Sequence, residues 1–169
     1  MMKRVWAVFA CLCIVVVGCG KEQKEPKRKT ETVEASQKQR EEKWPGLQLE
    51  TEVKAYTDHL EVTLSLENTS DDKKTLTFPS SQQFEVVVTH PNEGEVCRYS
   101  KDRMFTQALT TVELKAGEKK MWKASCPYNS TPLRKGETYQ ITAMLLPREI
   151  NDESVPSETF QKTIPFLFK

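Results

Sequence analysis

The sequence has few of the residues from which catalytic and metal sites are built. Its 169 residues include only two histidines, His59 and His90. These are too few for a three-histidine metal site, and they do not stand in a ligand spacing such as His-x-x-x-His. We expect each to be a polar residue at a turn or a strand end. There is no Gly-x-Ser-x-Gly motif, and the six glycines are too scattered for a phosphate-cradling loop. We therefore expect no catalytic residue, no metal site and no cofactor.

The charged residues are balanced. Lysine and arginine number 25 and aspartate and glutamate 24, for a formal net charge of +1, which gives no general attraction to nucleic acid. Two acidic pairs, Asp71-Asp72 and Asp152-Glu153, lie in turn-like stretches and are typical of solvated loops. The sequence indicates no nucleic-acid partner and no small-molecule substrate.

The first residues have the layout of a secretory signal. Lys3 and Arg4 precede an uncharged apolar run over residues 5–17, which is the order of such signals. A helix that spans a membrane needs about 20 apolar residues, but this run is interrupted at residues 18–20. The segment 1–18 is therefore predicted to be a signal peptide.

The end of this run, Val16-Val17-Gly18-Cys19, resembles the bacterial lipobox. In lipoproteins of this kind the cysteine thiol receives a diacylglyceryl group and becomes the new N-terminus. By that resemblance Cys19 is the lipidation site, membrane lipid is one partner, and the chain lies on the extracytoplasmic face of the cell membrane. The alternatives are a plain signal that is cut elsewhere and a short membrane helix.

A charged linker separates Cys19 from the globular part. Residues 20–43 are mostly Lys, Glu, Gln, Thr and Ser, a composition that cannot bury enough apolar surface to offset the entropy of ordering. A helix over residues 32–43 with Glu–Lys pairs is the competing interpretation. In either case residues 19–45 are predicted to act as lipid attachment and spacer.

From residue 46 to residue 169 the pattern favours an all-β domain. Apolar residues alternate with polar ones, and no stretch within the domain keeps a helical period. Short strands are separated by turn residues such as those at 68–72, 90–94, Gly117 and Gly136. This spacing without helical crossovers predicts an antiparallel immunoglobulin-like β-sandwich. The predicted strands fall at 47–53, 60–66, 76–78, 84–88, 96–99, 112–114, 121–124, 139–146 and 160–168.

Cys97 and Cys126 are predicted to form a disulfide. Removal of the signal takes Cys11 and Cys13 away, and acylation consumes the thiol of Cys19, so these two remain as an even pair in a compartment where thiols are not kept reduced. The alternative is two separate buried thiols that act as small apolar residues.

Several runs in this region resemble the BsuPI family, which is named for an intracellular proteinase inhibitor. They are LEVTLSLENTS at 60–70, TLTFPSSQQFEVVV at 75–88, the pair Glu95-Val96, MFTQAL at 104–109, LKAGE at 114–118 and the strand-like run at 139–146. Position 97 departs from the family pattern, which has tryptophan there. The resemblance implies a small β-sandwich that binds other proteins, a protease among them, and it identifies no inhibitory residues.

Met104 and Phe105 are the candidate partner-binding residues. With Ala108 and Leu109 they form either an exposed patch on a loop or a short helical turn that plugs one end of the sandwich, and we favour the second interpretation. The leading functional hypothesis is a membrane-anchored lipoprotein that binds a protein partner, with proteinase inhibition as one version. The alternative is a structural or assembly accessory of the cell envelope or spore.

Overall fold

The computed structural model describes residues 44–129 and 133–169. All regular elements within them are strands and every strand pair is antiparallel. None of the described residues forms a helix long and apolar enough to cross a membrane. The strands are β1 (Leu47–Ala55), β2 (His59–Asn68), β3 (Lys74–Phe78), β4 (Phe84–His90), β5 (Gly94–Arg98), β6 (Thr110–Leu114), β7 (Lys119–Pro127), β8 (Thr138–Leu145), β9 (Glu149–Ile150), β10 (Glu153–Ser154) and β11 (Gln161–Leu167).

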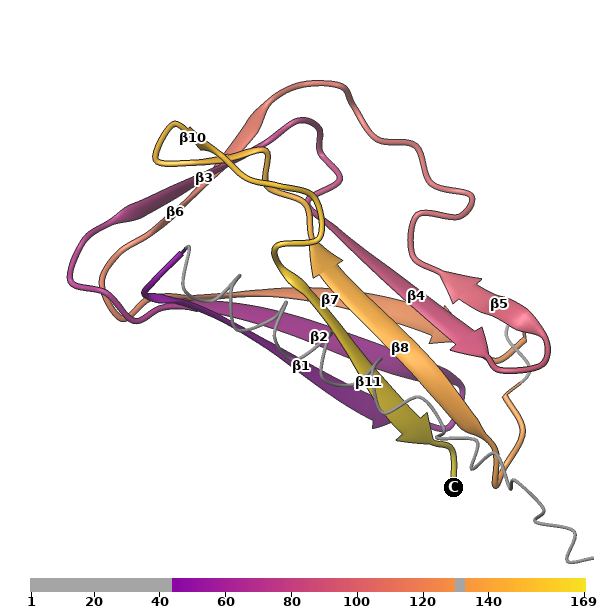
Figure 1. Cartoon of the computed structure of the whole chain (residues 1–169). Helices are drawn as coiled ribbons and strands as arrows, with labels where there is room; N and C mark the ends of the chain where they lie inside the picture. Colours follow the sequence, from indigo (N-terminus) through magenta and orange to yellow (C-terminus); the bar gives the residue numbers. More distant parts are fainter. Residues whose placement is uncertain (1–43, 130–132) are drawn as a thin grey trace, which may run out of the picture.

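Two sheets form the body of the sandwich. One has the strand order β1-β2-β7 and the other β11-β8-β4-β5 (Figure 1). In β2 every second residue is buried, as the alternation predicts, and Leu60, Val62, Leu64 and Leu66 are completely inaccessible to solvent. Burial of one such side chain stabilises a fold by about 1.5 to 3 kcal/mol. The expected β-sandwich is confirmed.

A third sheet, ordered β10-β9-β3-β6, lies at one end of the sandwich. The hairpin-like pair β3–β6 continues the pair β2–β7 beyond a break: Glu67 lies opposite Lys119, and after the break Lys74 lies opposite Leu114. Asn68 occupies the break and is fully buried.

Asn68 satisfies the backbone groups that the break leaves without ladder partners. Its side-chain amide donates to the carbonyl oxygens of Asp72, Leu114 and Lys115 at 2.8, 3.0 and 3.1 Å, and its side-chain oxygen accepts the N–H of Ser70 at 3.1 Å. The predicted turn at 68–72 is confirmed, and it forms because a short polar side chain bonds to nearby backbone.

Gly46 and Trp44 fix the start of the domain. Gly46 has φ +85°, a conformation that favours glycine. A Cβ at this position would lie 2.5 Å from Cβ of Ser70, so any other residue would force one of the two segments to shift. Trp44, which precedes the expected boundary at residue 46, is 8% exposed and belongs to the hydrophobic core.

The strands β9 and β10 were not expected from the sequence. Each has two residues, so neither is long enough to show alternation. Asn151 and Asp152, which connect them, have positive φ angles of 48° and 67°. The side chain of Asn151 accepts the N–H of Thr75 at 2.8 Å and joins this small hairpin to β3.

Candidate protein-binding loop between β5 and β6

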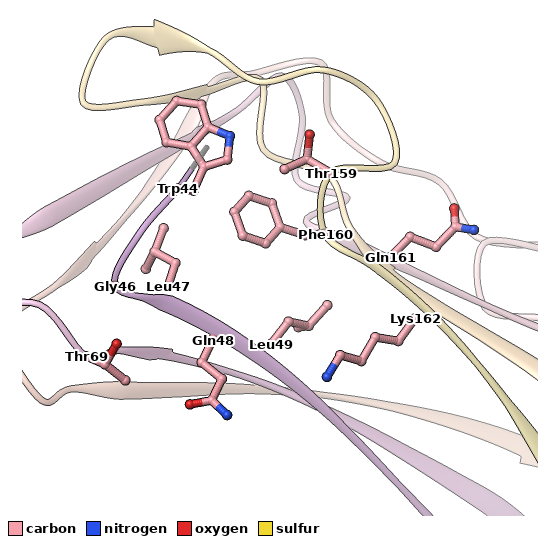
Figure 2. A pocket seen from close by; sticks show the side chains of 10 residues that line it. All are labelled: Trp44, Gly46, Leu47, Gln48, Leu49, Thr69, Thr159, Phe160, Gln161 and Lys162. Carbon is pink, nitrogen blue, oxygen red and sulfur yellow. The ribbon is translucent and has the colours of Figure 1, made fainter. Parts of the chain in front are cut away.

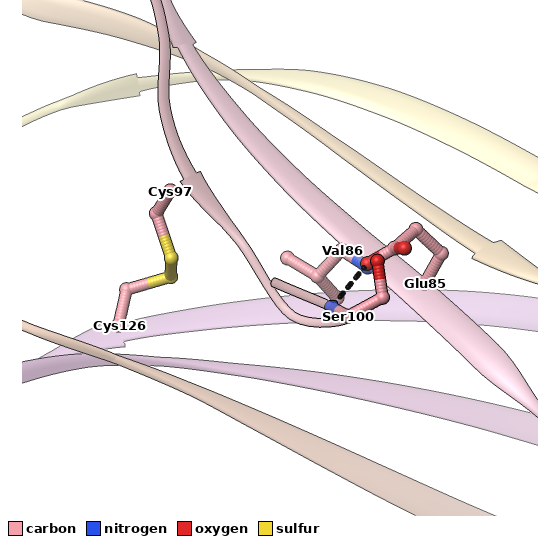
Figure 3. The surroundings of a disulfide bond; sticks show 5 residues. All are labelled: Glu85, Val86, Cys97, Ser100 and Cys126. Carbon is pink, nitrogen blue, oxygen red and sulfur yellow. Dashed lines mark hydrogen bonds between the residues drawn. A yellow bond between two sulfur atoms is a disulfide. The ribbon is translucent and has the colours of Figure 1, made fainter. Parts of the chain in front are cut away.

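A disulfide joins the edges of the two facing sheets. Cys97 lies in β5, at the edge of one sheet, and Cys126 lies in β7, at the edge of the other. Their Cα atoms are 6.1 Å apart, within the usual range for a disulfide (Figure 3). The predicted bond is confirmed, and the alternative of two separate thiols is wrong.

The disulfide is an important restraint on β5, because this strand makes few other interactions with the sheet. It has five residues, pairs only with β4 among the described strands, and has a register irregularity opposite Val88 and Thr89. Beyond its last residue the chain enters a loop, residues 99–109, which leads to β6. The disulfide therefore fixes the chain two residues before the loop begins.

Glu85 anchors the start of the loop through hydrogen bonds. This carboxylate is only 6% exposed. One of its oxygens accepts the backbone N–H of Val86 at 3.0 Å and that of Ser100 at 3.1 Å, and Figure 3 shows the bond from Ser100 as a dashed line. The other oxygen accepts the side-chain amide of Gln82 at 3.2 Å and lies 3.8 Å from the guanidinium of Arg98. A buried carboxylate is stable here because it is paired and hydrogen-bonded.

Aromatic contacts fix Tyr99, the first residue of the loop. The ring of Tyr99 stacks on Phe84 with centroids 4.1 Å apart, and Phe105 lies at 6.2 Å on a tilted plane. The guanidinium of Arg103 lies 4.4 Å from the centroid of the Tyr99 ring, a cation–π geometry. Tyr99 thus brings together the two limbs of the loop, before and after its tip.

A second anchor lies after the tip. The N–H of Thr106 donates to the hydroxyl of Ser81 at 2.9 Å, and the N–H of Ser81 donates to the carbonyl of Thr106 at 3.0 Å. Ser81 belongs to the connection between β3 and β4. Since both bonds are made by backbone groups of Thr106, the chain direction is fixed at this residue.

The tip between the anchors is exposed. Lys101, Asp102, Arg103 and Met104 are all exposed, and Met104 is 99% accessible to solvent. Asp102 has φ +61°, which turns the chain at the tip. Phe105 is half-buried, whereas Leu109 is 63% exposed.

The preferred expectation for this segment was wrong. No helical turn forms over residues 104–109, and Met104 does not plug the sandwich. Contacts of Tyr99 and Thr106 with distant parts of the chain hold the segment as an irregular loop, and the sequence MFTQAL by itself could not reveal these contacts. The other interpretation, an exposed loop patch, describes the observed geometry.

Charged groups at the base of the loop support the same arrangement. The guanidinium of Arg98 donates to the carboxylate of Glu95 at 2.9 Å through Nε. This hydrogen bond lowers the pKa of Glu95 below its usual value and raises the pKa of Arg98. Both groups stay charged at neutral pH, so the ion pair persists there.

The other residues singled out from the sequence lie away from this loop. His59 begins β2 and His90 ends β4, as expected; Nδ1 of His59 lies 2.7 Å from Asp58, and Nε2 of His90 lies 3.1 Å from Glu137. The two acidic pairs are exposed in turns or at the start of β10. Within the described residues no cluster of His, Cys, Asp or Glu is suitable for a metal ion. Cys19 lies outside those residues.

Sequence reasoning missed the residues that hold the loop, namely Glu85, Tyr99, Ser81 and Thr106. One signal was available. Glu85 is the only charged residue in a run of five, Phe84 to Val88, that is otherwise apolar. In the structure all five residues are buried, and an acid inside a buried strand has to be paired or hydrogen-bonded.

Three solved structures that resemble the chain are distant likenesses. A β-glucosidase from Kluyveromyces marxianus is 14% identical, with a TM-score of 0.40 over 73% of this chain and 14% of that chain. A protein from Archaeoglobus fulgidus is 13% identical, with a TM-score of 0.38 over 73% of this chain and 95% of that chain. A penta-heme cytochrome c552 from Thermochromatium tepidum is 7% identical, with a TM-score of 0.41 over 77% of this chain and 41% of that chain. At these scores the likenesses carry no argument about function.

No curated protein matches the chain significantly. The family model for BsuPI, described as intracellular proteinase inhibitor, matches residues 47–150. This range contains β1 to β9, both bonded cysteines and the whole loop between β5 and β6. Because this match spans more than half of the 169 residues, the chain belongs to the BsuPI family.

Proposed function

We propose that the domain inhibits a protease by inserting the loop 99–109 into its substrate cleft. The observation that carries this proposal is the exposure of Met104, which is 99% accessible to solvent although the loop is anchored on both sides of this residue. The family described as proteinase inhibitor supplies the class of partner.

The hydrogen bonds that anchor the loop on both sides of its tip favour tight binding to a protease. Binding an extended segment costs conformational entropy, and a segment already held in its bound shape avoids much of that cost. Here Ser100 is bonded to Glu85 on one side and Thr106 to Ser81 on the other. A loop fixed in this way can occupy the substrate cleft of a protease. Because the bound loop is held rigid, it resists the change of shape that cleavage of its backbone would require.

Met104 is the residue that enters the partner's specificity pocket in this proposal. Its side chain is long, unbranched and apolar, and it packs on nothing in the free protein. Such side chains fill apolar pockets adaptably. We therefore propose that the partner is an endoprotease that prefers large apolar residues.

The proposal also places the domain outside the cell membrane, tethered by a lipid on Cys19. What supports this is the sequence Val16-Val17-Gly18-Cys19 after an apolar run. A chain exported in this way would meet proteases other than those inside the cell, so the partner is a protease of the cell surface or envelope. Two acyl chains would suffice for stable anchoring.

Site-specific crosslinking tests both the partner and the surface. A photoreactive phenylalanine derivative replaces Met104 in one full-length variant and Met121 in another. Met121 is a matched control because it is also an exposed methionine, 60% accessible, but lies on β7. After illumination of intact cells, we expect a protease crosslinked through position 104 and not through position 121. Crosslinks from position 104 to envelope-assembly proteins alone would favour the structural alternative and overturn inhibition.

A further inference from the structure

A pocket opens on the side of the sandwich opposite the disulfide. The edge strands there are β1 and β11, which pair with β2 and β8 and not with each other. Between the first residues of these two strands lies a cavity of about 350 Å³. This volume equals roughly a dozen water molecules and is at the lower end of the range for small-molecule sites.

The floor of the pocket is apolar. Leu47 and Leu49 point inward from β1 and are 8% and 7% exposed, and Phe160, just before β11, is 6% exposed. Figure 2 shows the Phe160 ring directed toward Leu47, with Trp44 beyond it. These side chains form a surface against which an apolar group of modest size would pack.

Lys162 is the only charged residue that lines this pocket, and no carboxylate does. On β11 it shares a face with Ile164 and Phe166, which are half-buried, whereas Thr163 and Pro165 are exposed. In Figure 2 its side chain extends into the pocket toward Leu49. No ion pair joins Lys162 to a carboxylate in the part of the chain that the structure describes.

An unpaired lysine above an apolar floor is complementary to an apolar anion. A carboxylate would form a charge-assisted hydrogen bond with the ammonium group of Lys162, and an attached hydrocarbon tail would cover Leu49 and Phe160. From this arrangement we infer that the pocket binds a small carboxylate of the fatty-acid type. The family match ends at residue 150, so Lys162 and the β11 wall of the pocket lie beyond it.

Lysine on an edge strand has another known role. An inward-pointing charge at an edge discourages pairing with a second copy of the chain. In that case replacing Lys162 would promote self-association and would change no ligand binding. The two roles therefore predict different results for the same substitution.

Photoaffinity labelling of the full chain in isolated membranes separates them. The probe is a medium-chain carboxylic acid that carries a diazirine on its tail. We expect labelled peptides from residues 44–49 and 159–162, with competition by decanoate but much less by decanol or acetate. The Lys162→Met variant keeps the length of the side chain without its charge and should lose about tenfold in labelling, equivalent to about 1.4 kcal/mol.

Lys135→Met is the matched control, since Lys135 is an exposed lysine in the turn before β8, and it should be labelled like the unmodified chain. Formation of the Cys97–Cys126 bond, measured by mass spectrometry without reduction, shows that each variant has folded. Labelling that is confined to other segments, that survives Lys162→Met unchanged, or that is blocked better by a short apolar peptide than by decanoate would overturn the assignment.

Discussion

The backbone N–H of Ser100 donates to the buried carboxylate of Glu85 at 3.1 Å, across fifteen positions of the chain. Because Ser100 is the second residue of the loop and Glu85 lies in the central strand β4, this bond connects the exposed loop to the core of the sheet. The loop is therefore positioned by the fold and not only by its own sequence.

Replacement of Glu85 should damage both stability and inhibition. Glu85→Leu leaves the N–H groups of Val86 and Ser100 without this acceptor, and each buried unsatisfied group costs about 1 to 3 kcal/mol. Glu85→Gln keeps one acceptor oxygen and should cost less. Urea denaturation measures the free energy of unfolding. The control Glu113→Gln removes an exposed ion pair with Lys73 and should leave the stability nearly unchanged, because solvent screens such pairs. An equal loss of stability in the Glu85 and Glu113 variants would contradict the role of Glu85.

Loss of the disulfide should weaken the domain and release β5. The bond closes a segment with a sequence separation of 29, and the chain-entropy model gives about 3 to 4 kcal/mol for such a loop. This is a large share of the total stability of about 5 to 15 kcal/mol expected for a small domain. Denaturation of the Cys97→Ser, Cys126→Ser double variant measures it. Alkylation of both cysteines in the unreduced protein would show that the bond is absent.

Asn68→Ala should be among the most destabilising single substitutions in the domain. It removes the side-chain donors to Asp72, Leu114 and Lys115 and the acceptor for Ser70. We expect a loss of about 2 to 4 kcal/mol, because several buried backbone groups lose their partners together. Asn92→Ala, in the exposed turn between β4 and β5, is the control. A loss below about 0.5 kcal/mol at Asn68 would mean that water replaces these bonds.

The sequence predicts the strands of the domain better than it predicts the loop between β5 and β6. Alternation identified β2 because one of its faces is buried and the other is not. It did not reveal that both faces of β4 are covered, so that Glu85 is buried in this strand. The irregular loop at residues 104–109 is held by Tyr99 stacking on Phe84 and by Thr106 bonding to Ser81, and such distant contacts leave no local pattern in the sequence.

The disulfide was within reach of the sequence because it follows from counting. If the signal is removed and Cys19 is acylated, as we propose, Cys97 and Cys126 are left as an even pair, and an oxidising compartment would favour their bonding. The pocket between β1 and β11 was not within reach. Two residues that line it, Leu49 and Lys162, are brought together only by the way the two sheets pack.

The base of the loop should loosen in acid. The pKa of Glu95 is lowered by its hydrogen bond with Arg98 from an ordinary value of 4.5. A carboxyl whose pKa is lower in the folded state stabilises the fold above the unfolded pKa, and this contribution is lost as the pH falls through the folded pKa. Amide chemical shifts of residues 98–101 should therefore change below pH 4.5. Glu95→Gln should abolish this transition; its persistence in that variant would assign it to another group.

Lipidation can be tested separately from inhibition. Cys19→Ala should abolish metabolic labelling with a fatty acid and leave either an uncut precursor or a domain released to the medium. Cys97→Ser is the matched control because it removes another cysteine, one that forms a disulfide within the domain. Unchanged labelling of Cys19→Ala would remove the anchoring proposal and would leave the loop proposal as it stands.

The central claim is that the domain inhibits a protease through Met104, and a change of specificity tests it most directly. Inhibition constants of the full chain, of Met104→Lys and of Met121→Lys are measured against two serine proteases. One cleaves after large apolar residues and the other after lysine. We predict that Met104→Lys loses at least about tenfold against the first, or about 1.4 kcal/mol, and gains against the second, because specificity is a difference in pocket affinity. Met121→Lys should behave as the unmodified chain does. No inhibition by the unmodified chain, or equal constants for all three proteins, would contradict the claim.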